Sequence, residues 1–405
     1  MRLKNIDGAF RSQPTPEEQT RTGESVQARA PQKPSTPPLQ RDAFLNTVVR
    51  ADPLVDAVLR PLPSAPPPPT VRGRQPTYGS VEFEKKLDQL TDSVVRDGNK
   101  VTLLFDGINS YADRNRLIDG AKSTIHLQTF ILTDDETGWD LAKRLGRKAL
   151  EGVKVRLIYD ALGSARSDKE IFEFMEKCGV EIRAYGHPVK QFWDVNDRWH
   201  EKHLIVDGKV SIEGGMNIAD EYAFTGTGKL CPERGPTGEP WRDVDARLEG
   251  PAVADAQKAF LTNWKELGPE VDSAELVRLF PPLEVVGDGK VRVVQHRPDE
   301  DGDDNTHQLY LQAVRSAQKS ITIENAYFLP PKDLREALCD AARRGVEVKV
   351  LLNSRASTDF SFVWYATSHF YKDYVDAGVK LFEKHGPMVH AKTATFDGEY
   401  SIVGS

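Results

Sequence analysis

The chain has 405 residues, 39% of them hydrophobic and 28% charged, so it has room for two ordinary domains and a tail. A formal net charge of −7 argues against a dedicated nucleic-acid binder. No run approaches the roughly 18 apolar residues of a membrane span, and the first residues lack the apolar stretch of a secretory signal. Three widely spaced cysteines form no metal-binding pattern and indicate a reducing compartment.

Residues 1–76 differ in composition from the rest of the chain. They are rich in Pro, Arg, Gln, Ser and Thr, with four consecutive prolines at 66–69. Such a segment cannot bury enough apolar surface to offset the conformational entropy of ordering it. We therefore predict a disordered tail.

Hydrophobic periodicity beyond residue 76 predicts alternating strands and helices. The first half has predicted strands at 101–105, 124–132, 153–159 and 180–185, and predicted helices at 139–151 and 169–177. The second half repeats this order, with strands at 291–294, 320–323, 346–352 and 378–382 and helices at 307–318 and 334–344. Matching positions, such as Gly152 and Gly345, stay 190–199 residues apart, which indicates an internal duplication.

Helices between strands imply parallel or mixed sheets that helices cover. We predict an α/β fold of two pseudo-symmetric halves, 77–270 and 271–405, packed side by side.

The most specific feature is the pattern His-x-Lys-x₄-Asp, found at two matching places: His200, Lys202 and Asp207, and His390, Lys392 and Asp397. Two hits inside an internal repeat are not explained by composition. Residues two apart on a strand share a face, so each His and its Lys should point together. Each Asp precedes a Gly, a hairpin signal that favours a local turn role over direct catalysis.

Two histidines and two lysines facing one pocket suit a phosphodiester. The ammonium groups would neutralise phosphoryl oxygens and the charge that develops at a five-coordinate phosphorus. One neutral imidazole would attack phosphorus, and the other would donate a proton to the leaving alkoxide. Their surroundings must then push the two rings to opposite protonation states. We expect no metal and no cofactor.

These residues resemble the phospholipase D superfamily, whose mark is the duplicated motif, and within it bacterial cardiolipin synthases and related phosphatidyltransferases. The resemblance spans about residues 95–405 and includes the stretches 214–217, 220–222, 241–243, 326–330 and 388–393. It implies that His200 is the nucleophile and His390 the general acid, although sequence symmetry alone does not rank them. It also implies that Lys202, Lys392 and Asn217 hold the phosphoryl group.

The resemblance gives Asp243 the role of a carboxylate that orients the first histidine, His200; a strand-edge salt bridge with Arg242 is the alternative. Relatives continue beyond the second Gly-Ser with a further Asn, a strand, a carboxylate and a closing helix. Because the sequence stops at Ser405, we expect a truncated second half with weak or no activity.

The leading functional hypothesis is a phosphatidyltransferase that joins two phosphatidylglycerols and releases glycerol. The alternatives are a hydrolytic phospholipase D or nuclease-like phosphodiesterase, and a non-catalytic lipid-binding fragment. We expect a phospholipid partner, no nucleic acid, and a cytoplasmic protein that contacts the inner face of the cell membrane peripherally. One chain carries both motifs, so a monomer suffices. Candidate lipid contacts are Phe192, Trp193, Trp199, Phe360, Phe362, Trp364 and Tyr365.

Overall fold

The computed structural model describes residues 75–186, 198–232, 237–297 and 303–405. Contacts divide the chain into two units, Met1–Gly73 and Arg74–Ser405, and the second contains all the described elements. The predicted disordered tail lies outside the described residues except for its last two positions. None of the helices in the described ranges combines the length and the apolar character that a membrane crossing requires.

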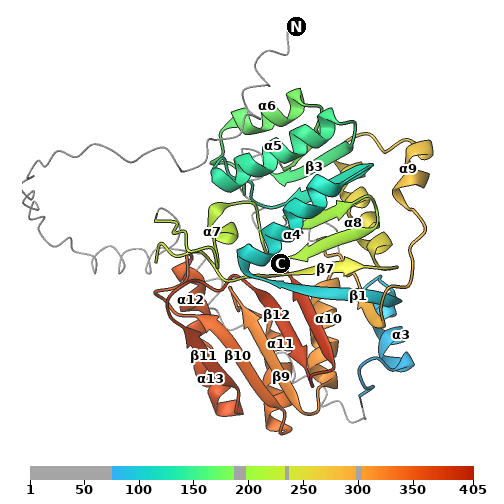
Figure 1. The fold of residues 1–405 in the computed structure, drawn as a ribbon. Helices are drawn as coiled ribbons and strands as arrows, with labels where there is room; N and C mark the ends of the chain where they lie inside the picture. Colours follow the sequence, from blue (N-terminus) through green and yellow to red (C-terminus); the bar gives the residue numbers. More distant parts are fainter. Residues whose placement is uncertain (1–74, 187–197, 233–236, 298–302) are drawn as a thin grey trace, which may run out of the picture. The chain divides into compact units, whose positions relative to one another are not determined.

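The first sheet has eight strands within the described ranges, in the order β4-β3-β2-β5-β6-β7-β1-β8 (Figure 1). Strands β2, β3 and β4 are parallel, and the other neighbouring pairs are antiparallel. The bounds are β1 Val95–Phe105, β2 Thr124–Thr129, β3 Lys154–Asp160, β4 Glu181–Tyr185, β5 His203–Val206, β6 Val210–Gly214, β7 Val244–Glu249 and β8 Gly289–Arg292.

The second sheet has the order β11-β10-β9-β12-β13 and repeats the pairing around β2 and β5. Strands β9, β10 and β11 are parallel, whereas β12 is antiparallel to both β9 and β13. The bounds are β9 Ser320–Asn325, β10 Glu347–Asn353, β11 Lys380–Lys384, β12 Lys392–Phe396 and β13 Tyr400–Gly404. In both halves, the strand that follows the motif therefore lies beside the first parallel strand.

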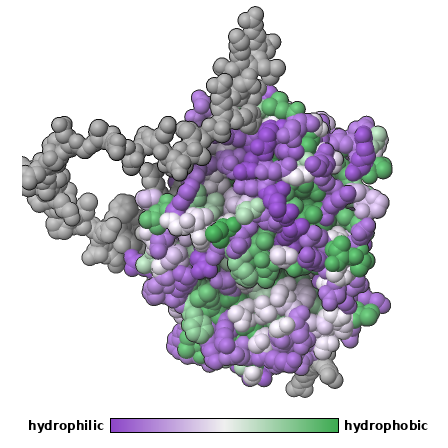
Figure 2. Space-filling view, in the orientation of Figure 1, coloured by the Kyte–Doolittle hydropathy of each residue, from purple (hydrophilic) through white to green (hydrophobic). Residues whose placement is uncertain are grey.

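Helices α4 (Asp106–Gly120), α5 (Glu136–Leu150) and α6 (Lys169–Lys177) cover one face of the first sheet, and α8 (Val253–Glu266) packs on the other. In the second half, α10 (Asn305–Ser316), α11 (Lys332–Arg343) and α13 (Tyr371–Ala377) bury one face of the smaller sheet. The remaining helices are α3 Val81–Leu90, α7 Asp220–Ala223, α9 Ser273–Leu279 and α12 Ser361–Ser368. Figure 2 shows mostly hydrophilic surface over α5 and α6, as expected for the outer sides of amphipathic helices.

The ends of α5 and α11 show how the duplicated sequence specifies duplicated structure. Gly152 and Gly345 follow these helices with φ of 91° and 94°, a left-handed conformation that glycine adopts without a Cβ penalty. A strand begins two residues later in each half, β3 and β10. The predicted α/β fold with two sheets flanked by helices is thus confirmed.

Two elements cross the predicted limits of the halves. β8, expected in the second half, pairs with β1 and forms an edge of the first sheet. α3, expected in the first half, packs Phe83 and Leu87 against Leu309 of α10. α3 buries its apolar side chains against the second half. β8 pairs its backbone hydrogen-bonding groups with an edge of the first sheet. The division at residues 270 and 271 stays a prediction.

Candidate active site

Each motif lies in extended chain that leads into a central strand. β5 begins at His203, after the first motif pair, and β12 begins at Lys392 itself. Lys202 Nζ lies 3.1 Å from His200 Nδ1, and Lys392 Nζ lies 3.0 Å from both ring nitrogens of His390. Each lysine also donates to the carbonyl oxygen of its own histidine. The two-residue spacing therefore brings each ammonium group to its imidazole, as the sequence predicted.

Main-chain pairing joins the two halves at the second motif. The segment before β7 forms a parallel bridge between Arg242 and Val389. Arg242 N donates to Met388 O, and His390 N donates to Arg242 O, each at 2.7 Å. Near the first motif, Ser405 Oγ donates to His200 O at 2.5 Å. His200 and Lys392 line the same cavity, and the charge of Lys392 lowers the pKa of His200, so the two motifs form one site.

Asp243 binds the second histidine, which corrects the prediction that it orients His200. Its Oδ2 lies 2.8 Å from His390 Nδ1, and both side chains are buried. The reason is the bridge just described, because it brings the residue after Arg242 beside the second motif. The alternative of a salt bridge with Arg242 is also wrong, since that guanidinium binds Asp106 at 2.7 Å.

Gly215 makes room for the Asp243 carboxylate. A Cβ at position 215 would lie 2.4 Å from Asp243 Oδ1, so a larger residue there would displace the carboxylate. Val244 N donates to the same oxygen at 2.8 Å and fixes the carboxylate plane. The Gly-Gly pair at 214–215 was noted in the sequence, but its steric role depends on a partner about thirty residues away.

Burial and mutual repulsion shift the proton equilibria of the site. Burial, together with the lysine charges, lowers the pKa of both His200 and His390 well below 6.5. Both pKa values shift in the same direction, and the opposition between the two protonation states stays a prediction. Burial also lowers the pKa of Lys392 to about 8 and raises that of Asp243 to about 6. A bound phosphate anion would favour the charged forms of both lysines and both histidines.

Asn217 is held from several sides. Its Oδ1 accepts from Ile131 N at 2.9 Å, and its Nδ2 donates to the Tyr222 hydroxyl at 2.9 Å. Tyr111 donates to the Asn217 carbonyl oxygen. The amide has two hydrogens, so one can still face a ligand. The role of Asn217 in holding a phosphoryl group stays a prediction.

Asp207 and Asp397 accept equivalent hydrogen bonds from backbone N–H groups in the two halves. Asp207 accepts from the backbone N–H groups of residues 122–124 at 2.7–3.1 Å. Asp397 accepts from those of residues 318–320 at 2.7–2.9 Å. Both have left-handed backbones, with φ of 53° and 55°. Burial raises the pKa of Asp207, but these hydrogen bonds outweigh it and hold the pKa below its usual value. The geometry supports the local role that the Asp-Gly pattern favoured, and a direct catalytic role is untested.

Three aromatic rings surround His390 and were not assigned a role from the sequence. Ring centroids of Tyr222, Trp241 and Tyr327 lie 5.0, 5.6 and 6.1 Å from its imidazole. Tyr327 also donates to Asp359 Oδ1 at 2.9 Å, and Lys392 Nζ lies 5.5 Å from its ring. The stretches 220–222, 241–243 and 326–330 had been noted as family-like, which was the available signal.

The half-buried Glu201 supports the first motif. Glu201 alternates with the two motif residues, and its carboxylate accepts from Asn263 at 2.5 Å and lies 3.5 Å from the imidazole of His203. Although burial opposes protonation, Glu213 and Glu201 raise the pKa of His203 to about 10. The β5 strand is thus fixed by an ionic network on the side away from His200.

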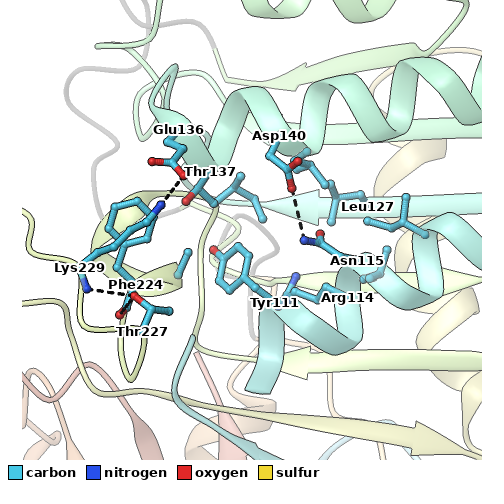
Figure 3. Close-up of a pocket in the computed structure, with 15 residues that line it drawn as sticks. Tyr111, Arg114, Asn115, Leu127, Glu136, Thr137, Asp140, Phe224, Thr227 and Lys229 are labelled. Carbon is cyan, nitrogen blue, oxygen red and sulfur yellow. Dashed lines mark hydrogen bonds and ion pairs between the residues drawn. The ribbon is translucent and has the colours of Figure 1, made fainter. Parts of the chain in front are cut away.

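A cavity of about 470 Å³ adjoins the site and is lined by residues of both halves, including His200, Tyr327 and Lys392. A second cavity, of about 220 Å³, lies between α4, α5 and the segment after α7 (Figure 3). Tyr111 lines it, and Lys229 pairs with Glu136 at its rim. The smaller cavity therefore contacts a support of Asn217 rather than the reacting groups. In the described ranges, no three His, Cys, Asp or Glu residues gather as metal ligands.

Comparisons with known proteins identify relatives of this chain. The chain is 32% identical over 344 residues to a cardiolipin synthase of Listeria welshimeri, covering 83% of this chain and 69% of that protein. It is 32% identical over 322 residues to a cardiolipin synthase of Halalkalibacterium halodurans, covering 78% of this chain and 61% of that protein. The crystal structure of phosphatidylserine synthase from Haemophilus influenzae has a TM-score of 0.54 at 14% identity, covering 78% of this chain and 79% of that chain. That likeness concerns the fold.

The duplicated fold and the paired His-Lys site define the phospholipase D class of proteins. Residues 115–225 and 310–405 match the family described as cardiolipin synthase, PLD-like domain. The chain belongs to this family.

Proposed function

We propose that this protein is a phosphatidyltransferase that joins two phosphatidylglycerols into cardiolipin and releases glycerol. The observation that carries the proposal is the single site built from two His-Lys pairs, with Asp243 against His390. Membership of the cardiolipin synthase family supports the lipid substrate.

In the first step, a ring nitrogen of His200 attacks the phosphorus of one phosphatidylglycerol. A P–N bond forms, the bond between phosphorus and the headgroup glycerol oxygen breaks, and His390 gives its proton to that oxygen. Lys202 and Lys392 face the remaining phosphoryl oxygens, where they stabilise the charge that develops.

In the second step, a headgroup hydroxyl of another phosphatidylglycerol attacks the phosphorus. His390 accepts the hydroxyl proton, the P–N bond breaks, and the free imidazole of His200 returns. Water in place of the second lipid would give phosphatidic acid instead. The two steps leave the protein unchanged and conserve the number of phosphodiester bonds.

The surroundings of the two rings favour His390 as the general acid. Its Nδ1 faces Asp243, which stabilises an imidazolium once a phosphate offsets the lysine charges. His200 is then the nucleophile, and its ring contacts Lys202 and Phe130. A ring that stays neutral is the better nucleophile.

A phospholipid substrate requires contact with a membrane surface. We propose that the protein is cytoplasmic and contacts the inner face of the cell membrane peripherally. Both motifs come from one chain, so a monomer can form the site.

The test is an assay with labelled phosphatidylglycerol, phosphatidylcholine and single-stranded DNA, using residues 1–405 and the longest form that the gene encodes. Cardiolipin formation supports transfer, phosphatidic acid alone supports hydrolysis, and cleavage of DNA alone contradicts the lipid substrate. His200→Ala and His390→Ala should each abolish turnover. Activity above a few per cent in both variants would exclude the paired-imidazole mechanism.

A further inference from the structure

Exposed aromatic side chains gather at the start of α12. Phe360, Phe362 and Tyr365 are 57%, 45% and 43% exposed. The rings of Phe360 and Phe362 lie 6.1 Å apart, and Trp364 packs edge-on against Tyr365 at 5.2 Å. We call Phe360, Phe362 and Tyr365 the aromatic patch. Its residues lie within six positions of one another, unlike the scattered apolar residues that are ordinary on protein surfaces.

Side-chain hydrogen bonds hold the helix that carries the aromatic patch. Trp364 Nε1 donates to Glu383 at 2.7 Å, and Thr367 Oγ1 donates to the carbonyl oxygen of Phe328 at 2.7 Å. The Arg355 guanidinium lies 5.1 Å from the Tyr365 ring. The helix is thus held against the second sheet, and a cation lies beside the exposed rings.

A hydrogen bond connects the start of the aromatic patch to a residue that lines the catalytic cavity. Asp359, the residue before the patch, accepts from the Tyr327 hydroxyl, and its charge acts on the pKa of Lys392. Tyr327 lines the cavity together with His200 and Lys392. The contacts from Asp359 to Tyr327 and from Tyr327 to Lys392 therefore link the residue before the patch to the reacting groups.

Three other candidate lipid contacts lie outside this surface. Trp199 is buried and stacks on Tyr185 at 4.1 Å, as expected for an ordinary core aromatic rather than a lipid contact. Phe192 and Trp193 lie outside the described residues.

We infer that the aromatic patch inserts into the headgroup boundary of an anionic phospholipid bilayer and so places the catalytic cavity against its substrate. The inference rests on the proposed function. Tyrosine and other aromatic side chains suit the membrane interface, and Arg355 supplies attraction to anionic headgroups. The occupant is a bilayer because the phosphodiester of a phospholipid lies at headgroup depth, where the patch and the catalytic cavity would meet the same surface.

The first test compares vesicle binding of the full chain and of a Phe360→Ser/Phe362→Ser variant. Vesicles of equal phosphatidylglycerol and phosphatidylcholine are sedimented, and the bound fraction gives a partition coefficient. Losing two inserted phenyl rings should weaken partitioning by at least about tenfold. The matched control is Val81→Ser/Val277→Ser, which removes two exposed apolar side chains from α3 and α9 and should change partitioning less than about twofold.

A second variant distinguishes lost membrane insertion from misfolding of the double serine variant. Phe362→Trp keeps an aromatic ring and should bind vesicles like the unaltered chain, with its added fluorescence quenched by brominated lipid. The inference is overturned if the unaltered chain does not bind the vesicles. It is also overturned if the double serine variant binds as well as the unaltered chain, or if the Phe362→Trp signal is not quenched.

Turnover separates this inference from the proposed function. On short-chain phosphatidylglycerol dissolved as monomers, the double serine variant should match the unaltered chain within about twofold, while its turnover on vesicles falls with its binding. Equal loss on both substrates would contradict a docking role. If the unaltered chain turns over neither substrate, the proposed function fails, while the vesicle comparison still decides whether the patch binds a bilayer.

Discussion

Asp243 of the first half lies 2.8 Å from Nδ1 of His390 in the second half, and both side chains are buried. Because a histidine and its carboxylate come from different halves, neither half alone contains a complete catalytic group. The contact gives the imidazole of His390 an anionic partner from the other half of the chain.

Asp243→Asn should reduce kcat by roughly 10²–10⁴-fold, because the amide no longer stabilises a charged imidazole or fixes its tautomer. Steady-state assays of the purified variant measure the effect. Asp106→Asn is the control, because it alters the half-buried carboxylate that pairs with the exposed Arg242, the neighbour of Asp243, and should leave kcat within about threefold. A Asp243→Asn variant with near-normal kcat would remove the carboxylate from the mechanism.

Asp207→Ala and Asp397→Ala should each destabilise the fold by about 1–3 kcal/mol, because backbone N–H groups lose their acceptor and alanine disfavours a positive φ. Urea unfolding measures the loss, and kcat of the folded fraction should stay within about threefold. Asparagine at either position tolerates the left-handed backbone and should cost less. A large fall in kcat at unchanged stability would instead indicate a direct catalytic role.

The pH dependence of kcat/KM should follow the lowered pKa values of the site. kcat/KM should fall above about pH 8 as Lys392 loses its proton. Lys392→Arg keeps the charge at high pH, so the variant should lose the fall near pH 8 even if its maximum is lower. An unchanged alkaline limb would assign that limb to another group.

Inorganic phosphate should stabilise the protein more at pH 7 than at pH 9.5. A folded pKa of about 8 for Lys392, below its ordinary 10.5, means that holding the charge destabilises the fold below pH 8. This penalty is relieved as pH rises from about 8 to 10.5. A bound anion offsets it at pH 7, and a hundredfold excess over Kd adds about 2.7 kcal/mol. Thermal unfolding with sulfate and with chloride as controls measures the difference, which should vanish in Lys392→Met.

Asn217→Ala should lower kcat by about 10²–10³-fold if its free amide hydrogen contacts the phosphoryl group. Tyr222→Phe removes only the hydroxyl that accepts from Nδ2 and should have a smaller effect. Circular dichroism melts of both variants measure the loss of stability that follows when the N–H of Ile131 loses its acceptor. A fall in kcat beyond that loss of stability is then due to the lost ligand contact. Equal small losses would leave Asn217 as a structural residue.

The repeated elements and the motif pairs could be predicted from the sequence. The period-two spacing put Lys202 beside His200 and Lys392 beside His390, and Gly152 and Gly345 marked equivalent helix ends, because these are local properties of a few consecutive residues. Local patterns could not predict that β8 completes the first sheet, because strand pairing depends on which edge is free in the folded chain. Only the tertiary structure decided that Asp243 serves His390 rather than His200. That partner is chosen by a bridge between Arg242 and Val389, 147 positions apart, and no pattern along the chain encodes such a distance.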